Sequence, residues 1–448
     1  MSTTTNTLNP RPAKTAKPDM PSTNTTSPST VAAAAARARR RRLPAVLMRA
    51  GTSRGLFLHR HHLPEDVNEW GPVLVAAMGS RMGDPRQLEG VGGATSTTSK
   101  VAVVSPSSRE GVDVEYTFVQ VTVGAEVVDL TGNCGNMASG VAAFALDEGL
   151  LSPQDGTLRV VSVYNTNTDV LLEETIAVDP ETGLFDPEGD YRISGVKRSG
   201  SLVKVKFVSP GGSMTGQTFP TGQRQQILEI TEGPAAPYSV RATLVDVSNP
   251  FVFVDAETMP SAYTDAAGGP DSEDARTIIE AIRQHASVLF GFATTTAAAS
   301  LQRGTPKISL LSSSDDADIK VFSYSMGKVH PSFQLTGAVC LGAATCLEGT
   351  VAADLLDKEK SLPPTPPLSS LSSSPKSETV IDLAESKTVA GAMVSEAVGE
   401  NAAARKITIQ HRSGTLDVEV DIAPNGDEAA GVTVYRTARR IFEGVIYA

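Results

Sequence analysis

Two helical stretches that are apolar on nearly every side constrain the fold of this chain most. They are "NMASGVAAFALDEGLL" at 136–151 and "LTGAVCLGAATCLEGT" at 335–350, and both are crowded with alanine and glycine. A helix that is apolar all round must be buried on every face, and small side chains let neighbouring backbones come close. Each stretch therefore predicts a helix at the centre of a surrounding sheet.

The remainder of the chain contains the strands that such sheets need. Many of these runs alternate apolar and polar residues, which is typical of half-buried antiparallel strands. They lie at 44–51, 112–123, 158–166, 202–208, 238–247, 317–326, 406–412, 415–422 and 431–440. Two amphipathic helices are expected at 64–78 and 273–291, and Pro64 and Glu65 would suit the first turn of the former.

The chain also shows signs of an internal duplication. Both apolar stretches end in Glu-Gly, at 148–149 and 348–349, and a shift of 200 residues superposes these ends. We predict an α+β fold of two domains, each a curved antiparallel β-sheet wrapped around a central buried helix. The expected divisions are a disordered basic tail at 1–42, a first domain at 43–200 and a second domain at 201–448.

Composition excludes several classes of function. The chain has 448 residues and a net charge of −11, with a pI near 5.2, which argues against nucleic acid as a partner. No apolar run approaches the roughly 20 residues of a membrane-spanning helix. The three cysteines, Cys134, Cys340 and Cys346, have no metal-binding spacing and indicate free thiols in a reduced compartment. A cytoplasmic protein is expected.

Two segments lack the composition of a packed core. The stretch at 1–30 is rich in Ser, Thr and Pro, and an arginine cluster follows at 37–42. A solvated basic tail is the simpler interpretation, and a transit peptide for the mitochondrial matrix is the alternative. The low-complexity stretch at 357–378 predicts a surface insertion in the second domain.

The motif "TGNCGN" at 131–136 places Cys134 just ahead of the first apolar helix. Asn133 and Asn136 suit helix caps, and Gly135 allows close backbone approach. A helix N-terminus binds carboxylates and favours a thiolate, so Cys134 could carry a proton. The alternative is a small buried hydrophobic residue, which is how most free cysteines behave.

The duplication tests whether a second thiol takes part. Under the shift of 200 residues, Cys134 falls on Gln334, while Cys340 and Cys346 lie inside the second helix. A mechanism with one thiol per domain is therefore excluded, and another group must be the partner acid or base.

Lys100 is the candidate partner. It ends the small, hydroxyl-rich loop "GGATSTTSK" at 92–100 and precedes the apolar strand "VAVV". Partial desolvation at this junction would make its amine a usable base, although an exposed surface lysine is the ordinary alternative. His330 lies in the equivalent loop of the second domain and suggests a substrate contact, or else a capping or core histidine.

The motifs "GGATSTTSK" and "NCGN" together resemble the PrpF family of Δ-isomerases, relatives of diaminopimelate epimerase. The resemblance extends from about Leu43 to the end, through "MRAGTSRG" (48–55), "HPSFQLTGAVC" (330–340) and "YRTARRIFEG" (435–444). It implies two epimerase-like domains with the site in the cleft between them. It further implies movement of a C=C bond in a small acid, without metal or organic cofactor, by Lys100 and Cys134.

The expected substrate is a small tricarboxylate or dicarboxylate, most simply of the aconitate type (cis- or trans-aconitate or 2-methylaconitate). A base removes an allylic proton and an acid returns one at the other end of the allyl unit, while donors stabilise the anionic transition state. A 4-oxalomesaconate-type tautomerase, or a non-catalytic accessory protein for an iron–sulfur hydratase, is the alternative. A homodimer is also considered. The expected substrate-binding residues are Thr52, Ser53, Thr95, Ser96, Asn133, Gly135, Asn136 and His330.

Overall fold

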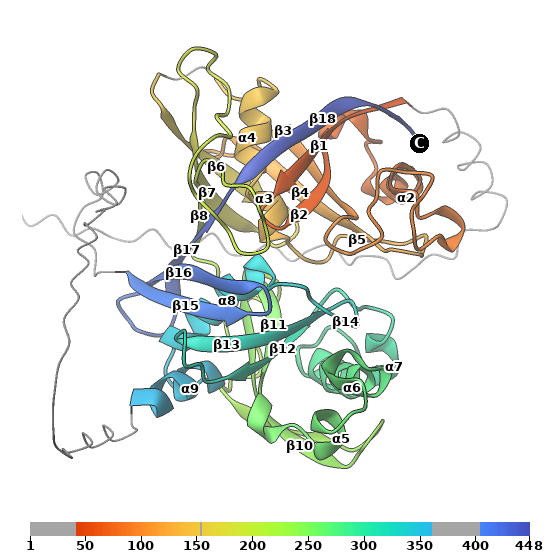
Figure 1. The fold of residues 1–448 in the computed structure, drawn as a ribbon, viewed down its shortest axis with the longest axis vertical. Coiled ribbons are helices and arrows are strands. Elements are labelled where there is room, and N and C mark those ends of the chain that lie inside the picture. The colour runs from red at the N-terminus through yellow and green to blue at the C-terminus, as the bar shows by residue number, and fades with distance from the viewer. Residues whose placement is uncertain (1–41, 153–154, 361–403) are drawn as a thin grey trace, which may run out of the picture.

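The computed structural model describes residues 42–152, 155–360 and 404–448. Its described strands form a continuous curved β-structure with two halves, each wrapped around a buried helix (Figure 1). The α+β class and the plan of two curved β-structures, each around a central buried helix, are confirmed. The tail at 1–41 and the part of the predicted insertion at 361–378 lie outside the described residues.

The first half surrounds two short helices in line, α3 (Gly135–Ala138) and α4 (Val141–Asp147). Helix α2 (Trp70–Met78) packs on the other face of its sheet in a separate apolar cluster. The strands of this half are β1 (Arg42–Ala50), β2 (Ser53–His59), β3 (Lys100–Pro106), β4 (Val114–Val121), β5 (Val128–Asp129), β6 (Leu158–Asn165), β7 (Val170–Ala177) and β8 (Val203–Val208).

The second half surrounds α8 (Leu335–Cys346), and α9 (Val351–Lys360) follows it. Helix α6 (Glu273–Leu289) covers the outer face, with the short helices α5 (Ser261–Thr264) and α7 (Thr296–Ala299) beside it. The strands are β9 (Gln226–Ile230), β10 (Tyr238–Val247), β11 (Asn249–Asp255), β12 (Lys307–Ser312), β13 (Ile319–Ser325), β14 (Lys328–Val329), β15 (Arg405–His411), β16 (Gly414–Ile422) and β17 (Ala429–Arg436).

The strand pairings repeat from one half to the other. In the first half β2 runs parallel to β3, β3 antiparallel to β4, and β4 parallel to β6. In the second half β11, β12, β13 and β15 show the same sequence of pairings. The sheets, which were predicted to be antiparallel, therefore also contain parallel neighbours. Long connections that carry α2 and α6 allow the parallel neighbours, because parallel strands need a crossover.

The last strand departs from the predicted division of the chain. Strand β18 (Ala438–Tyr447) pairs with β1, so the C-terminus returns to the first half (Figure 1). Strand β8 also pairs with both β7 and β17, which joins the two halves. The boundary at residue 200 stays a prediction, while residues 438–447 pair with β1 of the first half. Residues 357–360 end helix α9 and are not part of an irregular insertion.

Two predicted helices differ in their bounds. Helix α2 begins at Trp70 and not near Pro64, since Pro64 accepts hydrogen bonds from Arg60 and from the Trp70 indole in the turns before the helix. The helix expected at 136–151 is interrupted at Gly140. A Cβ there would lie 2.8 Å from the Phe57 ring, so the sheet lies directly against the helix backbone.

Close approach of the sheet also defines the second central helix. A Cβ at Gly342 in α8 would lie 2.5 Å from Cγ2 of Val418 on β16. Gly342→Ala should therefore lower the free energy of unfolding by a net of about 1–2 kcal/mol, despite the better helix propensity of alanine. Denaturant titration measures this loss. Val418→Ala removes the obstructing methyl groups, so the double variant should lose less than the sum of the single variants. Strict additivity would contradict the packing.

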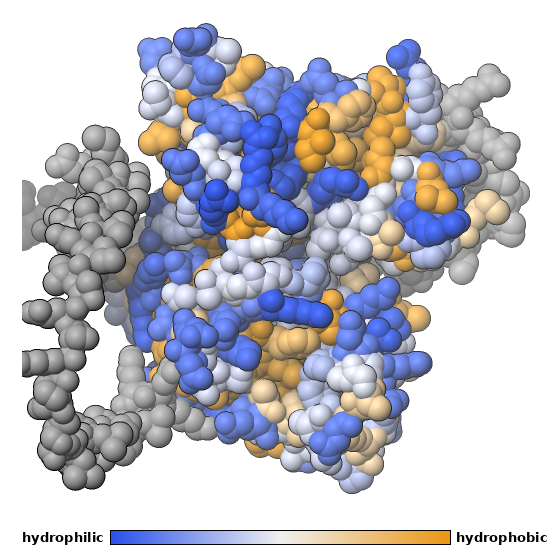
Figure 2. Space-filling model, in the orientation of Figure 1, coloured by the Kyte–Doolittle hydropathy of each residue, from blue (hydrophilic) through white to orange (hydrophobic). Residues whose placement is uncertain are grey.

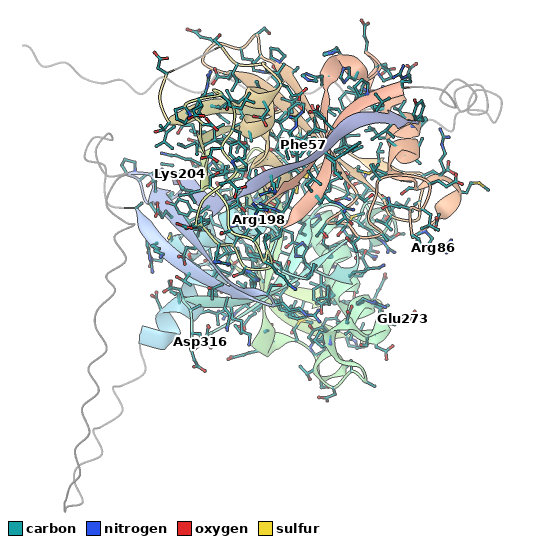
Figure 3. All side chains as sticks on the ribbon, turned by 45° about the horizontal axis from the view of Figure 1, so that its top comes forward. Phe57, Arg86, Arg198, Lys204, Glu273 and Asp316 are labelled. Carbon is teal, nitrogen blue, oxygen red and sulfur yellow. The ribbon has the colours of Figure 1, made fainter. Side chains whose placement is uncertain are left out.

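The surface of the described residues is mixed. Hydrophobic residues, orange in Figure 2, gather over the region where Figure 1 shows β1 and β18. The exposed apolar side chains of β18 are Ile441, Phe442, Val445 and Tyr447. Figure 3 shows Phe57 amid crowded side chains, whereas Arg86 and Asp316 project at the periphery. Among the described helices none alone is long and apolar enough to cross a membrane, and only the bent pair Leu335–Cys346 and Val351–Asp357 passes that test jointly.

Candidate functional site

Most of the predicted site residues meet in one cavity that both halves line. Its empty space, including the open mouth, is about 620 Å³. The first half contributes the start of β3, the end of β4 and the residues that enter α3. The second half contributes the start of β12 and the residues between β13 and α8.

Lys100 is the first residue of β3 and is buried, with 9% of its surface exposed. Its Nζ donates a hydrogen bond to Oε1 of Gln120 (2.8 Å) and lies 4.9 Å from the centre of the Phe118 ring. Gln120 in turn donates through Nε2 to the carbonyl oxygen of Ser99 (2.8 Å). The amine is thus fixed between the loop and β4, and it is not the exposed lysine of the alternative interpretation.

Hydrogen bonds from the Gln87 side chain hold the loop before Lys100 in place. Gln87 donates through Nε2 to the hydroxyls of Ser80 and Ser99, and accepts through Oε1 from the backbone N–H of Ala94. The Ser99 hydroxyl donates to the carbonyl of Val121. Because Ser99 is committed to these bonds, the hydroxyls left to line the cavity are those of Ser96 and Thr97.

Cys134 takes the N-cap position of α3 and is half-buried, with its side chain against the main core. The preceding Asn133 is anchored by its backbone, since its N–H donates to Asn249 Oδ1 and its carbonyl accepts from Asn249 Nδ2. Asn133 is 2% exposed, and its side-chain amide has no hydrogen-bond partner on either the nitrogen or the oxygen. A buried amide without partners costs free energy, and a ligand in the cavity could satisfy it.

Asn136 has a different role from the cap that the sequence predicts. It lies inside α3, and its Oδ1 accepts from the backbone N–H of Thr52 (3.3 Å) and from Nε of Arg436 (3.2 Å). Its Nδ2 donates to the Thr52 hydroxyl. Gly51 has φ +54, and a Cβ there would collide with the Asn136 amide. Asn136 therefore joins the turn after β1 to β17.

The second half contributes a neutral histidine. His330 is buried, and its Nδ1 accepts a hydrogen bond from the Ser332 N–H (3.2 Å). Burial lowers the pKa of His330 to about 4, so the ring is uncharged at neutral pH. With Nδ1 as acceptor, Nε2 carries the proton and can donate one hydrogen bond.

Gln334 occupies the position that the duplication assigns to a second thiol. It is the N-cap residue of α8, as Cys134 is of α3. Its amide is held by Ser323, which donates to Oε1, and by the carbonyl of Tyr324, which accepts from Nε2. An amide does not titrate near neutral pH. Of the two helix starts at the cavity, that of α3 therefore carries a thiol and that of α8 does not.

The structure brings most of the predicted residues together. Eight of the ten line the cavity: Lys100, Cys134, Ser53, Ser96, Asn133, Gly135, Asn136 and His330. Thr52 and Thr95 do not line it, and their part in substrate binding stays a prediction. Thr52 is turned to Asn136, and the Thr95 hydroxyl is exposed and bonded to those of Thr97 and Thr98.

The sequence reasoning missed several polar residues of the cavity, among them Gln120, Asp129 and Lys307. Gln120 and Asp129 carry no local signal. Lys307 does carry one, because "GTPKISLL" repeats the pattern of "TTSKVAVV", a lysine directly before an apolar strand. In the part of the chain that the structure describes, no group of three His, Cys, Asp or Glu side chains could hold a metal ion.

Comparisons with known proteins all point to the same family. A family model described as PrpF protein matches residues 40–361 and 376–448. The 3-methylitaconate isomerase of Eubacterium barkeri is 31% identical, over 91% of this chain and 97% of the relative. The 2-methyl-aconitate isomerase of Shewanella oneidensis is 32% identical, over 69% of this chain and 83% of the relative. A crystal structure of methylitaconate-delta-isomerase superposes with a TM-score of 0.63 at 28% identity, covering 91% of this chain and 96% of that one.

Proposed function

Since this chain belongs to the PrpF family, we propose that it is an isomerase that moves the C=C bond of a small carboxylic acid by transfer of a proton within an allyl unit. The observation that carries the proposal is the meeting of Lys100 and Cys134 in one cavity with the unpartnered amide of Asn133. A lysine and a cysteine supply an amine and a thiol, the two proton carriers that the reaction needs.

The chemistry follows from the acidity of an allylic carbon. Lys100, as the free amine, removes a proton from the carbon between the double bond and a carboxylate, and the electron pair of that C–H bond delocalises as a dienolate. The thiol of Cys134 returns a proton to the far carbon of the allyl unit, and the double bond is then displaced by one carbon. Solvent restores both groups, so no atom is gained or lost and no electron acceptor is required.

The surroundings of the cavity support an anionic substrate. The amide of Asn133 and the hydroxyls of Ser53 and Ser96 are donors that line it. The neutral ring of His330 adds an N–H without adding charge. Donors fixed in place stabilise the charge that develops on the dienolate. We propose a tricarboxylate of the aconitate type as the substrate, in agreement with the 2-methyl-aconitate named for one relative.

Proton NMR of the purified protein tests the proposal. Cis-aconitate, trans-aconitate, 2-methylaconitate and oxalomesaconate are each incubated with the enzyme, and the vinyl and methylene signals are followed. We expect one of the three aconitate-type acids to give the signals of its isomer. Conversion of oxalomesaconate alone would indicate the tautomerase, and binding without any conversion would indicate the accessory protein. Cytoplasmic location and a homodimer stay predictions.

A further inference from the structure

Lys307 occupies the same place in the second half as Lys100 does in the first. Each lysine is the first residue of a strand, β12 and β3 respectively. Each strand runs parallel to the preceding one, with Lys100 paired to Gly55 and Lys307 to Phe251. The following strand is antiparallel in both halves. The duplication therefore repeats the lysine, although it does not repeat the thiol of Cys134.

The two lysines differ in what they bind within the protein. Lys100 pairs across the ladder with Gln120 and donates to its amide. Because Ile308 pairs with Tyr324, the corresponding position beside Lys307 is Ser325, and its side chain is too short to repeat that bond. Among the described residues, Lys307 Nζ has no hydrogen bond or ion pair. It lies 5.9 Å from the centre of the Phe251 ring.

The ammonium of Lys307 nevertheless lies at the reactive end of the cavity. Its Nζ is 3.6 Å from the position that a Cβ on Gly132 would take, beside the residues that lead to Cys134. Lys307 and Lys100 both line the cavity. An ammonium without a partner in such a place has three donors for a ligand.

We propose that Lys307 binds a second carboxylate of the substrate, so that the cavity selects acids that carry at least two carboxylates. This inference rests on the proposed function for its class of substrate. One carboxylate lies next to the allylic carbon that Lys100 and Cys134 serve, and a second pairs with Lys307. An acid with one carboxylate would leave the half-buried Lys307 ammonium without a counter-ion, which is costly.

The charges around Lys307 agree with this role. Desolvation, together with the nearby charge of Lys100, lowers the pKa of Lys307 to about 8, while Asp129, Cys134 and Cys340 oppose the shift. The charge of Lys307 also contributes to the lowered pKa of His330, which is uncharged at neutral pH. Asp129 Oδ1 accepts from the N–H and hydroxyl of Thr131. The lysine is therefore mostly protonated at pH 7, and a bound carboxylate would raise its pKa.

Binding of propane-1,2,3-tricarboxylate tests the proposal by calorimetry. This acid has three carboxylates and no double bond, so its binding is independent of any isomerase activity. Lys307→Met should weaken binding at pH 7 by about 10- to 100-fold, the range for loss of a charged hydrogen bond. The matched control is Lys320→Met, which removes the same charge from an exposed position on β13 outside the cavity. The control should bind within about threefold of wild type.

The pH dependence of wild-type binding gives a second test that needs no apolar variant. A carboxylate binds the protonated amine, so the affinity should fall as the pH rises from 7 through 8 to 9.5. Lys307→Arg stays protonated throughout. It should retain affinity at pH 7 and lose less of it by pH 9.5 than the wild type does.

Three results would overturn the inference. The first is Lys307→Met that is folded and binds the tricarboxylate within about threefold of wild type. The second is Lys307→Arg with the same loss of affinity on raising the pH as wild type. The third is Lys307→Met with unchanged binding but no solvent exchange of substrate protons, which would make Lys307 a proton carrier. Failure of every acid to isomerise, with the expected tricarboxylate binding, would contradict the proposed function and leave the role of Lys307 supported.

Discussion

Cys134→Ser should fold as the wild type does and lose turnover by about 10²- to 10⁴-fold, the range for a general acid or base. Cys134 is half-buried at the start of α3, and a hydroxyl replaces its thiol with little change of volume. A serine hydroxyl is a far weaker acid than a thiol, so the return of the proton to carbon should become slow. Steady-state kinetics on the acid identified by NMR measures the loss.

The matched control for this variant is Cys346→Ser. Cys346 is also half-buried, but it packs against the core at the end of α8 and does not line the cavity. Its serine variant should retain turnover within about threefold of wild type. Calorimetry with propane-1,2,3-tricarboxylate should show that Cys134→Ser still binds the anion. A folded Cys134→Ser enzyme with wild-type turnover would remove the thiol from the mechanism.

Lys100→Arg and Lys100→Ala should separate proton transfer from binding. Arginine keeps the positive charge but stays protonated, so it cannot take a proton from carbon. Lys100→Arg should therefore bind an aconitate-type anion and lose exchange of the allylic protons by about 10²-fold or more. Lys100→Ala should lose exchange and also part of the affinity, because the charge that faces the anion is gone.

Deuterium uptake at the substrate methylene in D₂O, beside calorimetric binding, measures both effects. Gln120→Leu is the informative companion, since it removes the acceptor that holds Lys100 Nζ at 2.8 Å without touching the amine. It should slow exchange less than Lys100→Arg does. Wild-type exchange in Lys100→Arg would show that the lysine acts only through its charge.

Much of the site could be predicted from sequence because its chemistry lies in short segments. Lys100 ends a run of small residues, and Cys134 lies in the middle of another. The shift of 200 residues correctly aligned the two helix starts at Cys134 and Gln334. The two central helices were predictable for a similar reason. A helix that is apolar all round has one physical solution, burial on every side.

The remainder depends on contacts between distant segments, which local patterns do not encode. Asn136 suited a cap by its position, but its partners are Thr52 and Arg436, and the latter is 300 residues away. Thr95 belongs to the same hydroxyl-rich run as Ser96, and the turn of the loop decides which of the two lines the cavity. Lys307 precedes an apolar strand as Lys100 does, but the register of β12 beside β11 was needed to show that the two lysines occupy equivalent places.

In the proposed mechanism two different groups, Lys100 and Cys134, move the proton. A single turnover in D₂O with enzyme in excess over the aconitate-type substrate tests it most directly, with the deuterium content of the product read by NMR at the newly protonated carbon. If the amine takes one proton and the thiol, equilibrated with solvent, returns another, that carbon should carry deuterium in essentially every product molecule of the first turnover. Product that retains the original proton at that carbon would show that one group carries the same proton across, and would contradict the account.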